Sequence, residues 1–318
     1  MPHTLKRSDW FGPHGFPIAI ERREPQQPFP PHRHEFSEIV IVTGGRGRHA
    51  VGRESWPLAA GDVFVIGGPR THEYRELDNL SLINLLFQPD RLRLDLGDLA
   101  QLPGYHALFA LEPAWRQRHQ FKSRLRLTPH DLGGVLALVD DLDEEWKNRA
   151  PGFGFLGTAL FMQIVGYLSR CYGRSRNPDS ANLLRIAESI THLETHTDKP
   201  AHLDQLANLA RMSQRSFLRA FRAATGVTPI AYLIQLRINR AAALLRSGTE
   251  TVTEVAFRVG FTDSNYFSRQ FRKLTGVSPR RYRQQHLRER PELIGQTGFE
   301  LFRTLRTRDR RQPQDRGI

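Results

Sequence analysis

Cysteine is nearly absent from this chain, with Cys171 the only one in 318 residues. A single thiol forms neither an internal disulfide nor a thiolate metal cluster, which favours a reducing compartment. No stretch approaches the roughly 18 uninterrupted apolar residues of a membrane span. No apolar segment follows Lys6 and Arg7 as a secretory signal would require. The sequence therefore predicts a soluble cytoplasmic protein.

Acidic residues are scarce in the second half of the chain. Residues 1–180 hold 22 basic and 21 acidic side chains, whereas residues 181–318 hold 24 basic and 12 acidic ones. The formal net charge of +13 therefore belongs almost wholly to the second half. Such an excess is expected of a domain that docks on a polyanion. With 39% apolar residues, the chain can also bury the cores of two domains.

The first half has the pattern of an all-β domain. Residues 1–31 are rich in proline and charge, which predicts an N-terminal arm. Over residues 32–129, glycine and proline separate short β-branched runs, and this favours a sandwich or barrel. The runs are Ile39–Val42, His49–Val51, Val63–Ile66 and Leu80–Phe87. Residues 130–175 change to helical spacing and predict two helices, which either form a dimer surface or cap the barrel.

Four polar residues of this half resemble the two motifs of cupin barrels, His-x-His-x3-Glu and a later histidine. In metal-binding cupins these side chains hold one divalent ion, and three imidazoles with one carboxylate suit Fe, Mn, Ni, Cu or Zn. However, Gly67 stands where proline is usual, and no asparagine follows at the expected place. The sequence therefore favours a small-molecule site without a cofactor, with a metal as the alternative, on His32, His34, Glu38 and His72.

An internal repeat dominates the second half. Thr225–Pro229 recurs as Thr275–Pro279 at a shift of 50, and a pair of phenylalanines recurs at the same shift. Upstream, Leu206-Ala207 matches Val255-Ala256 at a shift of 49, which places one inserted residue in between. One structural unit has therefore been used twice. The repeated phenylalanines are Phe217 with Phe267 and Phe221 with Phe271.

Each copy is predicted to be a helix, a tight turn and a second helix that begins at an N-cap, Ser213 or Asp263. The phenylalanines face inward, so a polar face points outward. Arginine can read guanine and asparagine can read adenine in the major groove, while further arginines contact phosphates. The candidate DNA-binding residues are Arg215, Ser216, Arg219, Arg222, Ser264, Asn265, Ser268, Arg269 and Arg272. A helix over residues 231–246 could hold the two second helices in successive grooves.

Residues 182–286 resemble the DNA-binding domain of the arabinose-regulator (AraC/XylS) family. The resemblance rests on Ala256–Phe261, Ser264–Phe267 and Phe271–Pro279. It implies a seven-helix domain with two helix-turn-helix units and a transcription regulator, most often an activator. Double-stranded DNA, RNA polymerase and a second copy of the chain are the implied partners.

The first half fits this resemblance as a cupin-like sensor barrel. Its segments His32–Val42 and Gly61–His72 are similar to the regulators of L-rhamnose operons. The resemblance implies a small-molecule effector, with a sugar such as L-rhamnose as the expectation. The predicted fold is therefore multidomain: a cupin-like jelly roll with a helical pair, followed by an all-α domain.

The alternative function is a metal cupin enzyme, an isomerase or dioxygenase, fused to a DNA-binding module. It would use the same four barrel residues, but no nucleophile–base pair or phosphate loop accompanies them. The sequence therefore favours a regulator that is not an enzyme. The last segment, residues 287–318, holds eight arginines and five acidic residues. It is predicted to be a disordered tail that adds nonspecific attraction to DNA.

Overall fold

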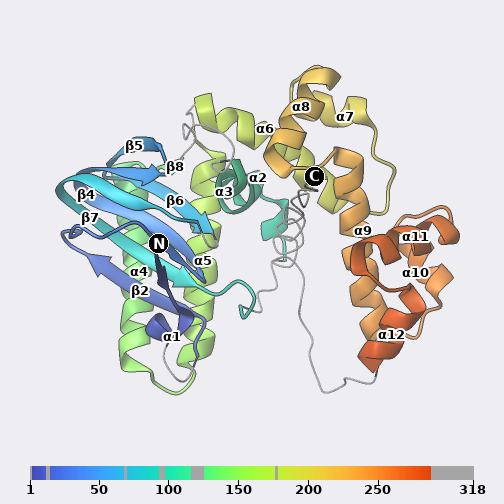
Figure 1. Cartoon of the computed structure of the whole chain (residues 1–318), viewed down its shortest axis with the longest axis horizontal. Helices are drawn as coiled ribbons and strands as arrows, with labels where there is room; N and C mark the ends of the chain where they lie inside the picture. The colour runs from blue at the N-terminus through green and yellow to red at the C-terminus, as the bar shows by residue number, and fades with distance from the viewer. Residues whose placement is uncertain are drawn as a thin grey trace, which may run out of the picture. The chain divides into compact units, whose positions relative to one another are not determined.

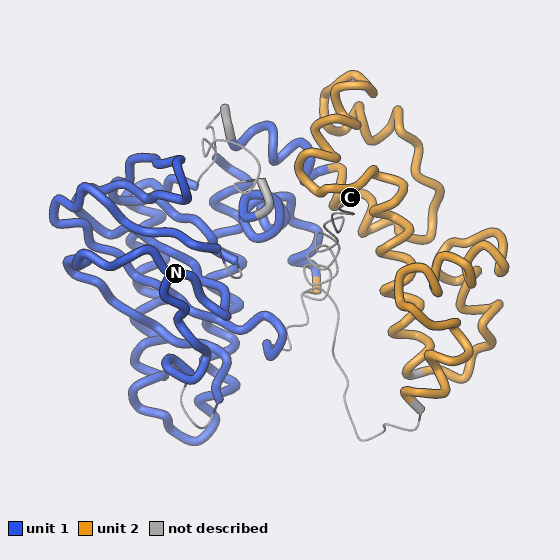
Figure 2. The backbone as a smooth tube through the Cα atoms, in the orientation of Figure 1, with its two compact units in different colours: residues 1–92, 98–188 blue, residues 93–97, 189–318 orange. Residues whose placement is uncertain are grey.

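In the computed structural model the chain folds into two compact units (Figure 2). The first consists of residues 1–92 and 98–188, and the second of residues 93–97 and 189–318. The structure describes residues 2–11, 15–67, 70–92, 97–115, 125–175 and 178–287. Apart from Leu287, the predicted tail lies outside the described residues. None of the helices in these described ranges combines the length and apolarity needed to cross a bilayer.

The first unit contains a six-stranded sheet and a separate two-stranded parallel pair (Figure 1). The large sheet has the order β2-β7-β4-β6-β8, with β5 also paired to β4, and its paired strands are antiparallel. The small pair joins β1 to β3. The strands are β1 (His3–Leu5), β2 (Ile18–Arg23), β3 (His32–His34), β4 (Ser37–Val51), β5 (Glu54–Ala59), β6 (Asp62–Gly67), β7 (Glu73–Phe87) and β8 (Leu125–Arg126).

The sheet is buried on both faces, which explains the continuous apolar runs of its central strands. On one face, β7 packs on a helix through Phe87 and Phe161, whose ring centroids are 5.3 Å apart. On the other face, alternate residues of β4 and β7 join an apolar core with β5 and β6. This inner core consists of Val40, Val42, Trp56, Leu58, Phe64, Ile66, Tyr74, Leu80 and Leu82.

Two expectations for this half are corrected by the structure. The predicted arm contains β2, whose residues Ile18–Arg23 pair with β7 at the edge of the large sheet. The glycines at 44, 45 and 47 do not end a strand, because β4 continues through them with register shifts against β7. At Gly45, φ is +66° and an added Cβ would lie 2.0 Å from the Asn79 carbonyl oxygen. These glycines therefore accommodate bulges that bend one long strand.

The helical pair predicted for residues 130–175 is present as two long helices, α4 and α5. Thr128 caps α4, and Arg22 of β2 bonds to Asp143 at 3.2 Å, which ties the sheet to this helix. Shorter helical segments lie between β7 and α4. The helices of this unit are α1 (Arg7–Trp10), η1 (Leu99–Gln101), α2 (Pro103–Tyr105), η2 (His106–Leu111), α3 (Glu112–Trp115), α4 (Pro129–Asn148) and α5 (Phe153–Gly173).

The single thiol provides a test of the packing of α5. Cys171 is buried, and this burial, with the nearby charge of Asp131, raises its pKa to about 11. At pH 8 only about one thiol in 10³ is then the reactive thiolate. We expect the native chain to resist iodoacetamide at pH 8 and to react fully in guanidinium, as measured by mass spectrometry. Rapid alkylation of the native chain would contradict this packing.

The second unit is helical. Helix α6 begins in the first unit and ends in the second, and with the six helices that follow it the DNA-binding segment has seven described helices, as the resemblance implies. Ser213 and Asp263 cap the second helix of each repeat, as predicted, and Gly226 and Gly276 end those helices in left-handed conformations. The helices are α6 (Pro178–Thr195), α7 (Leu203–Leu209), α8 (Gln214–Thr225), α9 (Pro229–Ser247), α10 (Val252–Arg258), α11 (Ser264–Thr275) and α12 (Pro279–Leu287).

The two helix-turn-helix units repeat each other down to their backbone hydrogen bonds. In the first turn, the amides of Arg211 and Met212 donate to the carbonyls of Asn208 and Ala207. In the second, Gly260 and Phe261 donate to Phe257 and Ala256, a shift of 49 at each position. The first residue of each pair has a positive φ, +52° in the first turn and +94° in the second. The inserted residue therefore lies between this turn and the N-cap that follows it.

This equivalence gives a paired prediction. An added Cβ at Gly260 would lie 2.6 Å from the Asp198 carbonyl oxygen at a backbone angle that favours glycine. We expect Gly260→Ala to lower the free energy of unfolding by about 2 kcal/mol or more. The matched change Arg211→Gly should instead be neutral or stabilising by up to about 1 kcal/mol, since it relieves a left-handed non-glycine residue. Urea titration would contradict the prediction if both variants lost stability equally.

Candidate DNA-binding surface and sensor site

The second helices of the two repeats, α8 and α11, each divide into a buried and an exposed face. Phe217, Phe221, Phe267 and Phe271 are completely buried, as their spacing predicts. The predicted DNA-binding residues lie on the remaining surface. Those exposed are Arg215, Arg219, Arg222, Asn265, Arg269 and Arg272, and those half-buried are Ser216, Ser264 and Ser268.

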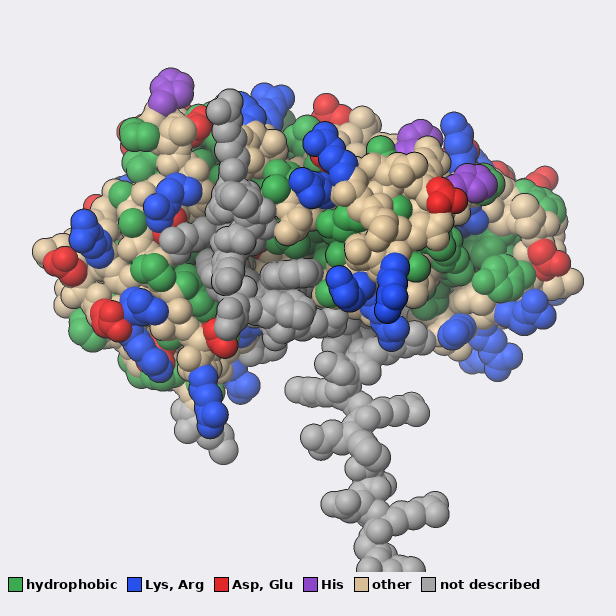
Figure 3. Space-filling model, turned by 90° about the horizontal axis from the view of Figure 1, so that it is seen from above, with side chains coloured by type: hydrophobic (Ala, Val, Ile, Leu, Met, Phe, Trp, Pro, Cys, Tyr) green, Lys and Arg blue, Asp and Glu red, His purple; other side chains and the backbone are tan. Residues whose placement is uncertain are grey.

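The arginines of these exposed faces are available for an external partner. Within the described part of the chain, none of the five forms an ion pair, and Arg269 only lies over the Tyr266 ring at 6.0 Å. Other arginines of the unit have internal roles: Arg258 pairs with Glu250 at 2.7 Å, and Arg237 donates to the Thr197 carbonyl. Burial lowers the pKa of Arg237, as expected of a structural guanidinium. On the face drawn in Figure 3, Lys and Arg side chains are spread over the surface, with acidic side chains among them.

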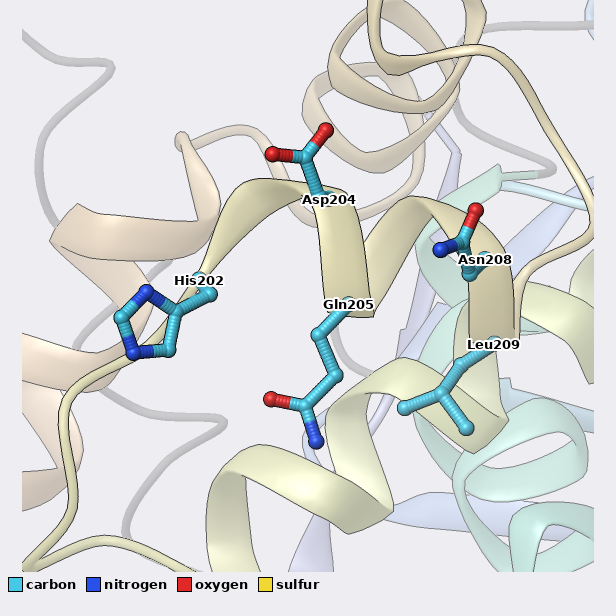
Figure 4. A pocket seen from close by; sticks show the side chains of 5 residues that line it. All are labelled: His202, Asp204, Gln205, Asn208 and Leu209. Carbon is cyan, nitrogen blue, oxygen red and sulfur yellow. The ribbon is translucent and has the colours of Figure 1, made fainter.

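An open hollow lies beside α7 in the first repeat (Figure 4). Its five lining residues come from this helix and the residue before it, and one of them, Asp204, accepts a hydrogen bond from Gln214 of α8. This bond ties the first helix of the repeat to the start of the second. The lining residues are His202, Asp204, Gln205, Asn208 and Leu209.

In the first unit, three of the four predicted barrel residues converge. His34 Nε2 lies 3.0 Å and His72 Nε2 3.9 Å from the same oxygen, Oε2 of Glu38. One ligand atom from each residue lies within 4.8 Å of the other two, and all three side chains are buried. The strands bring these three side chains together: His34 lies on β3, Glu38 lies on β4, and His72 directly precedes β7.

The fourth predicted residue, His32, stands beside this group rather than in it. Its backbone pairs with that of His72 through two hydrogen bonds of 3.0 and 2.9 Å, and the two rings are 4.3 Å apart. Burial lowers the pKa of His32 and lowers that of His72 well below its usual range, with further lowering by neighbouring imidazoles. Both imidazoles are therefore neutral near pH 7.

Sequence reasoning missed four polar residues on the same inner face. His49 pairs in register with Trp56 and Tyr74, which places its ring 5.3 Å from that of His72. Glu21 and Asn84 pair across β2 and β7, and Val40 of the inner core is the neighbour of Asn84 on β4. Burial raises the pKa of Glu21 to about 7 and that of Tyr74 well above its usual range. The alternation of inward-facing and outward-facing positions along β7 is the sequence signal that could have identified Tyr74 and Asn84. The residues that pair with them on neighbouring strands could not be read from the sequence.

Comparison with known proteins agrees with both units. A family of helix-turn-helix domains matches residues 206–285, and the AraC-like ligand binding domain family matches residues 16–143. The HTH-type transcriptional activator RhaR of Mannheimia succiniciproducens is 30% identical over 285 residues, which are 90% of this chain and 98% of that protein. RhaR of Escherichia coli strain K12 is 31% identical over 286 residues, or 89% and 98% of the two chains.

Among solved structures, the DNA-binding domain of AdpA, a global transcriptional factor, in complex with a target DNA is 35% identical. The match covers 34% of this chain and 97% of that chain, with a TM-score of 0.33.

A ligand-binding β-domain joined to two helix-turn-helix units defines a DNA-binding transcription regulator. The chain belongs to the AraC family of transcriptional activators, because its similarity to the RhaR activators extends over most of both chains. The two matched domain families are a helix-turn-helix domain and an AraC-like ligand binding domain, and the relatives that match over most of the chain are transcriptional activators.

Proposed function

We propose that this protein activates transcription in response to a sugar, and that L-rhamnose or a close relative is the effector. The two helix-turn-helix units carry the proposal, because their exposed arginines form no ion pair with any residue that the structure describes. It is further supported by the polar residues on the inner face of the β-domain and by the similarity to RhaR activators. On this proposal the protein is a regulator and not an enzyme.

The proposed DNA contacts follow from the chemistry of the exposed faces. Arg215, Arg219, Asn265 and Arg269 reach base edges, with Ser216, Ser264 and Ser268 beside them, while Arg222 and Arg272 contact phosphates. The long helix α9 connects the two helix-turn-helix units, so one chain would read two segments on one face of the DNA. RNA polymerase and a second copy of the chain complete the assembly. The exposed Phe155 and Leu156 of α5 are candidate dimer contacts.

The proposed effector site lies on the inner face of the large sheet. Asn84 is buried and its Oδ1 has no hydrogen-bond partner among the described residues. Together with Glu21 and Tyr74 it offers the donors and acceptors that sugar hydroxyls require. The effector need only bind one arrangement of the two units better than another to shift their populations. A coupling of about 1–3 kcal/mol suffices for regulation.

The test is footprinting on the DNA upstream of the protein's own gene and its neighbours, with and without L-rhamnose at fixed salt. Protection of two stretches about one helical turn apart, changed by the sugar, is expected. Asn84→Leu should keep the protection and lose the response to the sugar. Protection that does not change with L-rhamnose but changes with another sugar would show that the other sugar is the effector. If the folded protein protects no DNA, the proposal that it is a transcription regulator is contradicted.

A further inference from the structure

We propose that Arg237 fixes the placement of the two helix-turn-helix units relative to each other, and so determines which spacing between two DNA segments the protein accepts. Arg237 is a positioning residue, because it acts through the arrangement of the two repeats and not through a contact with a base. The inference rests on the proposed function, in which one chain reads two segments. It is carried by the way α9 is shared between the repeats, by the contacts of Arg237, and by the anchoring of the loop that Arg237 holds.

Helix α9 belongs to both repeats. Its first half packs in the first repeat, where the Tyr232 ring lies 5.7 Å from that of Phe221. Its second half belongs to the core of the second repeat, which contains Phe267 and Phe271. The α9 residues buried in that second core are Ile238, Ala241, Ala242 and Leu245. Arg237 directly precedes them, so it lies where the helix passes from one repeat to the other.

Arg237 contacts segments of both repeats. Its Nε donates to the Thr197 carbonyl at 2.7 Å, and its Nη2 donates to the Lys199 carbonyl at 2.8 Å. Its guanidinium carbon lies 5.7 Å from the centroid of the Phe261 ring, within reach of a cation–π interaction. Thr197 and Lys199 lie between α6 and the first repeat, whereas Phe261 follows the first helix of the second repeat. One side chain therefore joins the entry of the first repeat to the turn of the second.

The loop that Arg237 holds is itself anchored on both sides. Thr197 is buried, and its hydroxyl donates to the Glu194 carbonyl at the end of α6 at 2.7 Å. Asp198, between the two bonded carbonyls, lies against the turn of the second repeat. The approach is so close that an added Cβ at Gly260 would lie 2.6 Å from the Asp198 carbonyl oxygen. The loop is therefore a fixed point to which the middle of α9 is tied.

This tie determines the spacing of the two DNA-reading helices. Helix α6 is joined to the first repeat, because the Ser189 hydroxyl donates to the Leu206 carbonyl at 3.0 Å. Long helices bend gently, so α9 by itself would let the angle between the repeats vary. One base pair moves a DNA segment by about 3.4 Å and rotates it by about 35°. Repeats that are held at one angle therefore match one spacing, and repeats that move would tolerate its neighbours.

The first measurement uses DNA. The wild-type full chain selects its site from a random pool of duplex DNA, with and without L-rhamnose, and one base pair is then inserted or removed between the two selected segments. We expect the wild type to bind the altered sites at least about tenfold more weakly than the selected site, and Arg237→Gln to reduce this ratio to about threefold or less. Partial unfolding lowers both affinities equally and cancels in the ratio, so a merely structural role would leave it unchanged.

Two further variants sharpen this comparison. Arg237→Lys keeps the charge but replaces the planar fork by a single ammonium group, so it should give an intermediate ratio. Arg240→Gln is the matched control, since Arg240 is an exposed arginine of the same helix and the change removes the same charge. It should keep the wild-type ratio.

The second measurement needs no DNA. Spin labels at Arg222→Cys and Arg272→Cys occupy equivalent exposed positions of α8 and α11, and Cys171→Ala removes the native thiol. Electron paramagnetic resonance then gives the distribution of distances between the two labels. We expect a narrow distribution in the otherwise unchanged chain, a broader or shifted one with Arg237→Gln, and no change with Arg240→Gln.

The outcomes separate the inference from the proposed function. Equal ratios for wild type and folded Arg237→Gln, or equally narrow distance distributions, overturn the inference and leave the proposed function intact. A wild type that selects only one segment contradicts the proposed function, and the distance distributions still decide whether Arg237 fixes the two repeats. If Arg237→Gln does not fold, Arg237→Lys decides, because a wild-type ratio in that variant overturns the inference. A wild type that binds the altered sites as tightly as the selected one overturns it as well.

Discussion

Phe267→Ala is expected to lower the free energy of unfolding of the DNA-binding unit by about 3–5 kcal/mol. The side chain is completely buried in the core of the second repeat, where its ring lies 5.2 Å from Phe261 and 5.6 Å from Phe271. A domain of this kind has only about 5–15 kcal/mol to lose. Calorimetry of the full chain should show the melting temperature of one transition falling by about 12 °C or more.

The chain provides a matched control in Phe257. It has the same side chain in the same repeat, one helix away, but it is 54% exposed. Phe257→Ala should therefore change stability by no more than about 0.5 kcal/mol. DNA affinity measured at a temperature at which both variants are folded distinguishes a loss of binding caused by unfolding from one caused by a lost contact with DNA. Similar losses in both variants would show that burial does not determine the stability of this repeat.

Arg269→Ala and Arg272→Ala are expected to impair DNA binding in different ways. Removing Arg269 should cost about 1–3 kcal/mol on the cognate site and relax base preference at one position, since we propose that this arginine contacts a base. Removing Arg272 should weaken all sequences alike. It should also reduce the slope of log K against log salt concentration by about 0.9, the value for one phosphate contact.

Fluorescence anisotropy on cognate and scrambled duplexes at several salt concentrations measures both effects. Arg258→Ala removes the same charge from the same unit, but its guanidinium already pairs with Glu250. This control should lose less affinity than Arg272→Ala. An equal loss on every sequence for both Arg269→Ala and Arg272→Ala would show that the recognition face has been misassigned.

The sequence alone determined the features that depend on neighbours along the chain. Helical spacing, N-caps such as Ser213 and Asp263, and the 50-residue repeat involve residues within a few positions of each other or copied in order. The helix-turn-helix units and their buried phenylalanines were therefore predictable. Even the position of the inserted residue followed from the change between shifts of 49 and 50.

The tertiary structure decided what depends on strand pairing between distant segments. Proline content suggested an arm before residue 32, yet Ile18–Arg23 joins the sheet because β7 offers it a free edge. The bond pair between His32 and His72 sets a register that leaves His32 beside the cluster. The same pairing brings His49, on β4, next to His72. A shift of one residue in a strand reverses which side chains face inward, so composition and spacing alone do not define such a site.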